Sequence, residues 1–133
     1  MLTLVDSNVL LDVLSEDPTW ESWSAQAIEQ CAVDGHLCIN AIIYAEVSTD
    51  FARIEDVNLA LPEDFFRRLP MPLEAAFLAG KAYVNYRRHG GTRTCALPDF
   101  FIGAHAAVAG MRLLTRDARR YRAYFPMVEL LTP

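Results

Sequence analysis

Four widely separated acidic residues have the types and positions needed for one chemical site: Asp6, Glu46, Asp99 and Asp117. Asp6 and Asp117 each follow a short apolar run, and Asp99 begins a predicted helix. A structural role would explain any one of these three, because acids at helix N-termini accept backbone N–H bonds and suit the helix dipole. It does not explain Glu46, which interrupts the apolar segment 42–47, where a carboxylate is costly unless it is paired or bound to a metal.

Alternating strands and helices predict the scaffold that would bring these acids together. The pattern indicates the α/β class, in a single domain over residues 1–133 with three α/β/α layers and a central, mostly parallel sheet. Ligands of such folds bind at the carboxyl edge of the sheet, where three of the four acids follow different strands. Thr19 and Asn40 are the expected N-caps of the second and third helices. The expected strands are 2–5, 37–39, 113–115 and 127–131, and the expected helices are 7–15, 19–33, 40–51, 63–69, 73–89, 98–110 and 117–124.

The gathered acids predict a metal-dependent reaction. Four carboxylates at one edge would repel one another and raise their own pKa values unless a divalent cation compensated their charge. Ligation by carboxylates without His or Cys selects a hard cation, so Mg²⁺ is the expected cofactor, with Mn²⁺ able to replace it. Such an ion supports phosphodiester hydrolysis, because it activates a water molecule, orients it and offsets charge on the phosphate. The sequence therefore predicts a small metal-dependent nuclease.

Four segments of the chain resemble the PIN-domain nucleases, and among them the VapC-like toxins of bacterial toxin–antitoxin pairs. The segments are Val5–Leu10, Tyr44–Glu46, Leu97–Ala106 and Leu113–Asp117. They stand in the expected order and at the expected separations, and the resemblance covers essentially the whole chain. It implies a magnesium-dependent endoribonuclease acting on RNA, with Asp6, Glu46, Asp99 and Asp117 as its catalytic acids. Of these, Asp6, Asp99 and Asp117 are the expected metal ligands.

The same resemblance implies two protein partners: a second copy of the chain in a homodimer, and a cognate antitoxin that blocks the site. The antitoxin is expected to dock an apolar segment beside the acids and to place an Arg or Lys against them. The helix 73–89 is a candidate for the dimer contact, through the side chains of Leu73, Phe77, Tyr83 and Tyr86.

Four polar or basic residues are candidates for contact with the RNA substrate: Asn8, Thr115, Arg93 and Arg116. Asn8 and Thr115 flank the acids in the resembling segments, although Asn8 would alternatively satisfy helix N–H groups. Arg116 and Arg120 would share one helical face. The best candidate for a phosphate-binding patch therefore consists of Arg116, Arg119, Arg120 and Arg122. An exposed, solvated face is the alternative for each single arginine.

The composition excludes several classes of protein. A hydrophobic fraction of 53% is ample for a packed core and argues against disorder. The net charge of −5 would disfavour nucleic acid, but residues 1–66 carry −12 and residues 67–133 carry +7. Such asymmetry indicates a charged binding face, unless the two halves mix in space and the field averages out. No apolar run reaches the ~20 residues of a membrane span. The N-terminus does not resemble a signal peptide, and three cysteines without a CxxC motif fit reduced thiols in the cytoplasm.

Two other functions compete with the nuclease. An aspartyl-phosphate phosphatase would also place an acid after its first strand, but it needs a second Asp where this chain has Asn8. It would also need a lysine near the phosphate, whereas Lys81 is the only lysine. A catalytically silent PIN-like module that only binds RNA or protein would not need to keep all four acids. A general-base role for His105 is disfavoured, because its apolar surroundings in the sequence indicate a packed histidine.

Overall fold

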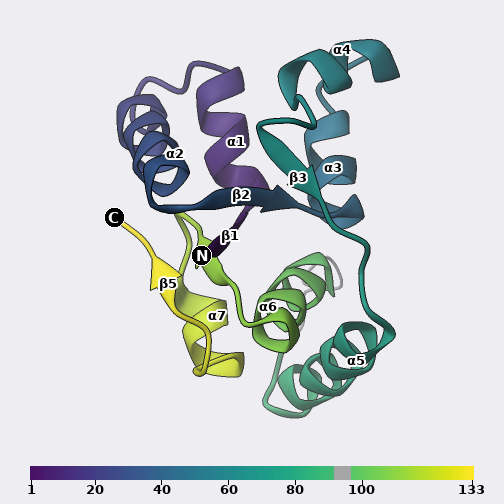
Figure 1. Ribbon diagram of the computed structural model, residues 1–133. Coiled ribbons are helices and arrows are strands. Elements are labelled where there is room, and N and C mark those ends of the chain that lie inside the picture. The colour runs from purple at the N-terminus through teal and green to yellow at the C-terminus, as the bar shows by residue number, and fades with distance from the viewer. Residues whose placement is uncertain (92–96) are drawn as a thin grey trace.

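A five-stranded sheet forms the centre of the molecule, with the strands in the order β3-β2-β1-β4-β5 (Figure 1). The computed structural model describes residues 1–91 and 97–133, so Arg93 and Cys95 lie outside the described residues. All four strand pairings are parallel. Helices cover both faces, which confirms the three-layer α/β/α fold. The strands are β1 (Leu2–Val5), β2 (His36–Ile39), β3 (Phe66–Arg68), β4 (Arg112–Leu114) and β5 (Leu130–Leu131).

Strand β1 occupies the middle of the sheet, because both of its edges are paired. Leu4 lies opposite Cys38 of β2 and opposite Leu113 of β4. All three side chains are 0% exposed, as expected for parallel strands that are covered on both faces. The residue that follows this strand, Asp6, therefore lies at the middle of the carboxyl edge of the sheet.

The helices divide between the two faces according to the direction in which the chain crosses the sheet. Helices α1 to α4 cover one face, and α5 to α7 cover the other (Figure 1). Right-handed crossovers require this division, because the chain first moves outward from β1 to β3 and then returns toward β5. Within the described residues, no helix is both long and apolar enough to cross a membrane. The helices are α1 (Ser7–Leu14), α2 (Glu21–Asp34), α3 (Ala41–Ser48), α4 (Ile54–Ala60), α5 (Leu73–Arg88), α6 (Leu97–Ala109) and α7 (Arg119–Tyr124).

Side-chain caps fix two of the helix starts beside the site. Asp6 caps α1 by accepting the N–H of Ser7 at 2.8 Å. Asn40 caps α3, as predicted, by accepting the N–H of Ile43 at 2.9 Å. The prediction that Thr19 caps α2 was wrong. That helix begins at Glu21, and the side chain of Asp17 instead accepts the N–H of Thr19 at 2.9 Å.

The predicted helix over residues 63–69 was also wrong. The helix of this region is α4, and residues 66–68 form the edge strand β3, which pairs with β2. Phe66 is buried, but Arg67 and Arg68 are exposed. An edge strand that carries two exposed arginines shows no apolar run, so its pattern did not indicate a strand. The last helix and the last strand are shorter than predicted, because α7 begins only at Arg119 and β5 only at Leu130.

Candidate active site

Asp6 is the central acid of the candidate site and is only 3% exposed. Besides capping α1, its carboxylate accepts two hydrogen bonds from hydroxyl groups at Oδ2. Thr115, which follows β4, donates from Oγ1 at 2.8 Å, and Tyr121 of α7 donates from its phenol at 2.9 Å. The carboxyl edge of the sheet and α7 thus hold one carboxylate in a fixed position.

Burial and neighbouring negative charge raise the pKa of Asp6 to about 6. Burial contributes most, because a low dielectric disfavours the charged form. The hydrogen bonds from Thr115 and Tyr121 oppose this shift, whereas the charges of Asp99 and Glu46 add to it. The same environment raises the pKa of Tyr121 well above its ordinary value, so the phenol remains a hydrogen-bond donor. A positive charge placed here would lower the pKa of Asp6 and favour its ionised form.

Glu46, in α3, is connected to Asp6 by Ser7, which donates a hydrogen bond to each of the two acids. The Ser7 hydroxyl donates to Oε1 of Glu46 at 2.8 Å. Burial raises the pKa of Glu46, with a further contribution from the charge of Asp99. The side chain is half-buried, which agrees with the expectation that an acid in this apolar segment needs a special environment. Two acids that are 40 positions apart in the sequence are therefore joined by the residue that begins α1.

Asp99 lies in the first turn of α6 and completes the acidic cluster, which we define as Asp6, Glu46 and Asp99. Its charge contributes to the raised pKa values of both other members. Its Oδ2 forms a very short ion pair with the guanidinium of Arg120, from α7. That guanidinium also lies over the rings of Tyr86, at 5.4 Å, and Phe100, at 6.0 Å.

The fourth predicted acid, Asp117, lies at the rim of this cluster. It is exposed, and its Oδ1 accepts the N–H of Arg119 at a long 3.4 Å. The charges that raise the pKa of Asp6 come from Asp99 and Glu46. Asp117 instead lines a neighbouring pocket together with Arg119 and Arg120. The structure thus brings three of the four predicted acids into one cluster and leaves the fourth beside it.

The predicted substrate residues Asn8 and Thr115 contact each other and the backbone near the site. The Asn8 amide donates to Oγ1 of Thr115 at 3.3 Å, and its Oδ1 accepts the backbone N–H of Arg116 at 3.1 Å. Asn8 therefore links α1 to the loop that follows β4. Thr115, which accepts the hydrogen bond from Asn8, donates its own to Asp6. The remaining predicted contact, Arg93, lies outside the described residues.

The guanidinium of Arg116 is occupied by a different acid, Asp12 of α1. Two hydrogen bonds, of 2.7 and 3.0 Å, join it to both carboxylate oxygens of Asp12. The ring of Trp20 lies 5.2 Å from the same guanidinium. Arg116 also precedes α7, so the expectation that it shares a helical face with Arg120 was wrong. A phosphate could reach Arg116 only in competition with a bidentate ion pair.

Sequence reasoning missed several residues that shape this site. Ser7 and Tyr121 hold the acids, and Asp12 holds the arginine beside them. Asp12 gave the clearest signal, since it stands between the apolar residues Leu11 and Val13 of a short helix, where a carboxylate needs a partner. The tyrosine gave none, because its role depends on the tertiary contact that brings α7 to Asp6. The packed state expected for His105 is confirmed: it is 1% exposed, and Nδ1 lies 3.0 Å from the side-chain amide of Asn40.

The oxygen donors of the acidic cluster suit a hard divalent cation. Mg²⁺ usually takes one or two protein carboxylates and keeps several waters. As the side chains lie, no three acidic, histidine or cysteine side chains of the described residues are grouped closely enough to hold a metal ion. Positive charge at Asp99 is supplied by Arg120. The fit to a cation therefore rests on the chemistry of the oxygens and on the burial and neighbouring negative charge that raise the pKa values of Asp6 and Glu46.

Comparisons with known proteins agree with the architecture. A crystal structure of VapBC2 from Rickettsia felis, bound to a DNA fragment from their promoter, matches with a TM-score of 0.76 and 16% identity, over 100% of this chain and 99% of that chain. FitAcB from Neisseria gonorrhoeae matches with a TM-score of 0.68 and 20% identity, over 97% and 96% of the two chains. A toxin–antitoxin complex from Klebsiella pneumoniae gives 0.69 and 23%, over 98% and 97%.

Sequence comparison assigns the family. None of the curated proteins compared with the chain matches it. The PIN domain family, however, matches residues 3–126, which is nearly the whole chain and includes all four predicted acids. The chain therefore belongs to the PIN-domain family, the family of nucleases that its sequence motifs resemble.

Proposed function

We propose that this protein is a Mg²⁺-dependent endoribonuclease of the cytoplasm and the toxin of a toxin–antitoxin pair. The observation that carries the proposal is the acidic cluster at the carboxyl edge of the sheet. Its members come from three separate segments, and the pKa values of Asp6 and Glu46 are raised by burial and, in addition, by the charge of Asp99. A buried carboxylate with two further acids beside it is costly to the fold unless a cation offsets the charge. Mn²⁺ would serve in place of Mg²⁺.

Each residue of the site has a distinct task in this proposal. Asp6 and Asp99 would hold the cation, with Asp117 reaching it from the rim. When bound, the ion supplies charge for the phosphate and lowers the pKa of a water. Thr115 and Tyr121 fix the orientation of Asp6. Glu46, whose pKa is raised and whose Oε1 accepts a hydrogen bond from Ser7, would accept the proton of the attacking water.

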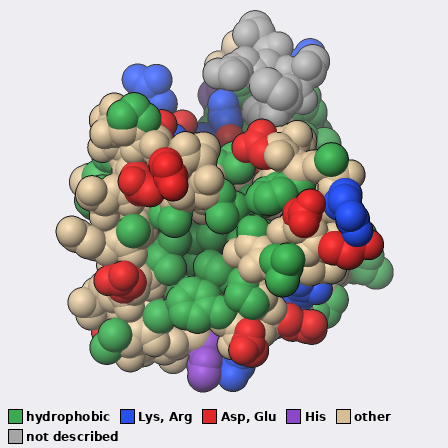
Figure 2. Space-filling model, turned by 90° about the horizontal axis from the view of Figure 1, so that it is seen from above, with side chains coloured by type: hydrophobic (Ala, Val, Ile, Leu, Met, Phe, Trp, Pro, Cys, Tyr) green, Lys and Arg blue, Asp and Glu red, His purple; other side chains and the backbone are tan. Residues whose placement is uncertain are grey.

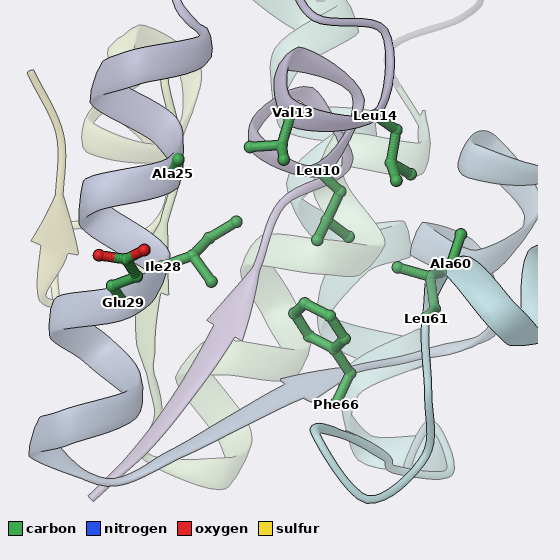
Figure 3. Close-up of a pocket in the computed structure, with 9 residues that line it drawn as sticks. All are labelled: Leu10, Val13, Leu14, Ala25, Ile28, Glu29, Ala60, Leu61 and Phe66. Atoms are coloured by element: carbon green, nitrogen blue, oxygen red, sulfur yellow. The ribbon is translucent and has the colours of Figure 1, made fainter.

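The neighbours support a protein partner. The matched structures include VapBC from Rickettsia felis and a toxin–antitoxin complex from Klebsiella pneumoniae. On this chain an apolar pocket of about 220 Å³ opens between α1, α2 and α4. Figure 3 shows Leu10, Ile28, Leu61 and Phe66 directed into one space from separate elements. We infer that an apolar segment of the antitoxin docks there.

The charge around this pocket favours a basic partner. Seen from above in Figure 2, the apolar side chains lie in a hollow bordered by acidic side chains. An arginine carried past the hollow to the acidic cluster could bond a carboxylate bidentately and displace a cation. The affinity of the antitoxin should therefore fall as Mg²⁺ rises at constant ionic strength. Calorimetry of the complex across a Mg²⁺ series measures this, and an affinity indifferent to Mg²⁺ would place the inhibitor elsewhere.

We also propose that the protein forms a homodimer, through fewer residues of α5 than the sequence suggested. Leu73 and Phe77 of α5 are 84% and 69% exposed and could meet a second copy. Tyr83 and Tyr86, by contrast, pack on Phe100, with ring centroids 5.9 and 5.4 Å away. We therefore propose that the first turns of α5 form the self-complementary contact.

A cleavage assay tests the function. The purified chain is incubated with RNA that contains single-stranded loops, in Mg²⁺, in Mn²⁺, in EDTA, and in EDTA followed by excess Mg²⁺. We expect cleavage with either ion, none in EDTA, and recovery on re-addition. Undiminished cleavage in EDTA would overturn the mechanism. A silent PIN-like module, in contrast, would show neither cleavage nor calorimetric binding of the ions.

A further inference from the structure

Arg120 lies where the acidic cluster meets a second pocket. Its guanidinium pairs with Asp99, and the same side chain lines a pocket of about 400 Å³. The full lining of this pocket is Tyr86, Asp117, Arg119, Arg120, Ala123 and Tyr124. One basic side chain therefore borders both the proposed cation site and an adjacent polar space that contains a second arginine.

The ion pair of Arg120 differs from that of Arg116, the other arginine near the site. Arg116 bonds both oxygens of Asp12, whose side chain is 4% exposed. The Arg120 and Asp99 side chains are 23% and 34% exposed, so water and ions can reach this pair. A pair that is open to solvent gains less from its attraction and is more easily exchanged. Arg120 is thus the more readily released of the two cations.

Arg120 and the proposed cation would compete for the same carboxylate, Asp99. A divalent ion held at Asp99 would stand beside the guanidinium and repel it. Rotation about the flexible arginine side chain would then carry the guanidinium toward the pocket, where Arg119 lies exposed at the rim. The guanidinium already lies over the rings of Tyr86 and Phe100. Planar guanidinium groups bind phosphate bidentately, so a phosphate in the pocket is a suitable new partner.

We propose that Arg120 exchanges with the divalent cation at Asp99 and, once released, binds an RNA phosphate in the pocket between α5 and α7. Without the ion, Arg120 partly neutralises the acidic cluster. With the ion, it becomes a phosphate contact next to the proposed site of cleavage. This inference rests on the proposed function, because it places the cation at Asp99, and it adds a subsite for the substrate.

Calorimetric titration of the full chain with Mn²⁺, at constant ionic strength, tests the exchange. Arg120→Gln removes the competing charge and should bind Mn²⁺ about three- to tenfold more tightly than wild type. Arg120→Lys keeps a cation and should bind the ion nearly as wild type does. Arg88→Gln is the matched control, because it removes an exposed arginine of α5 that does not line the pocket, and it should leave the Mn²⁺ affinity unchanged. Thermal melting establishes that each variant is folded.

The second measurement concerns phosphate. Adenosine 5′-monophosphate is an uncleavable probe that carries a phosphate like that of a cleavage product. Its affinity for wild type should rise when Mn²⁺ is present, and Arg120→Gln should reduce that affinity about threefold or more. Tighter Mn²⁺ binding together with weaker nucleotide binding is the signature of exchange, since general damage to the site would weaken both.

Three outcomes would overturn the inference. The first is Mn²⁺ affinity in Arg120→Gln that equals or falls below that of wild type. The second is nucleotide affinity that does not depend on Arg120. If wild type cleaves RNA with Mg²⁺ in either case, the proposed function stands and only the exchange fails. The third is a wild-type chain that neither binds Mn²⁺ nor cleaves RNA, and this result would remove both proposals.

Discussion

Two buried carboxylates of the same short stretch of chain have opposite surroundings. Asp6, which caps α1, and Asp12, within α1, are each 3% exposed. Asp12 receives both arms of the Arg116 guanidinium and the hydroxyl of Ser24, at 2.8 Å. In the described part of the chain, Asp6 accepts hydrogen bonds only from neutral groups, and other acids lie around it.

The difference separates a structural acid, Asp12, from the acid that we propose to be functional, Asp6. The charge of Asp12 is already compensated by Arg116, and this ion pair joins α1 to the loop after β4. A buried carboxylate that accepts hydrogen bonds only from a backbone N–H and hydroxyls, among like charges, lacks a compensating positive charge. Burial by itself would not distinguish the two, whereas the charge of the hydrogen-bond donors does. Perturbed pKa values mark functional sites on the same grounds.

The largest expected effect comes from neutralising a member of the acidic cluster. Asp99→Asn keeps the shape of the side chain and removes one charge, so cleavage of RNA should fall by at least about 100-fold. Its stability without metal should change little, because the lower repulsion among the acids offsets the lost ion pair with Arg120. Cleavage rates and urea unfolding measure both effects. Asp50→Asn, an exposed acid after α3, is the control. A wild-type cleavage rate in Asp99→Asn would remove this acid from the site.

The reverse result is expected at the structural acid. Asp12→Asn leaves the guanidinium of Arg116 without its ionic partner and should lower the free energy of unfolding by about 2–3 kcal/mol. The cleavage rate of the folded variant should stay within a few-fold of wild type, because Asp12 does not touch the acidic cluster. Urea unfolding followed by circular dichroism supplies the measurement. If Asp12→Asn lost activity without losing stability, the division between the two acids would be wrong.

The stability of the metal-free protein should depend on pH through Asp6. Its pKa is raised from 3.8 to about 6 in the folded state, so between these values the folded protein binds more protons than the unfolded chain. The free energy of unfolding should therefore fall as pH rises from 4 to 7, by about 2 kcal/mol. Glu46, whose pKa is also raised, acts in the same direction. Unfolding in EDTA across this range tests the slope, which Asp6→Asn should flatten. A rise in stability would contradict the raised pKa.

The smallest effect concerns the phenol that supports Asp6. Tyr121→Phe removes a donor whose hydrogen bond lowers the pKa of Asp6. The lower limb of the pH–rate profile should move upward by less than about one unit, with a cost in stability of about 1 kcal/mol. Tyr44→Phe provides the comparison, since its hydroxyl donates to Asn58 elsewhere on the molecule. A profile that shifts equally in both variants would show that the Tyr121 hydroxyl does not act through Asp6.

Local signals explain which parts of the fold could be predicted. The apolar run of β1 and the caps at Asp6 and Asn40 depend on neighbouring residues, and the structure has them where expected. Strand β3 could not be found, because its pairing with β2 satisfies the backbone while Arg67 and Arg68 face solvent. Its existence depends on a tertiary contact that no local pattern records.

The same limit applies to the site. Acids that follow strands must meet at the carboxyl edge of a parallel sheet, so Asp6 and Glu46 could be placed in advance. The partner of Arg116 could not, since Asp12 lies 104 positions away in the sequence. The sequence does not show whether an arginine is available to a phosphate or already paired with a carboxylate. Only the packing of α1 against the loop after β4 decides between them.

The long-range hydrogen bonds to Asp6 also set when the site can form during protein synthesis. Thr115 and Tyr121 lie 109 and 115 positions further along the chain. A nascent chain emerges from the ribosome N-terminal end first, so it carries Asp6 and Glu46 long before the donors that fix the central carboxylate have been translated. The complete arrangement requires β4 to pair with β1 and α7 to follow it. A fragment that ends before α7 therefore lacks the assembled site, so the proposed nuclease activity requires synthesis of the chain at least as far as Tyr121.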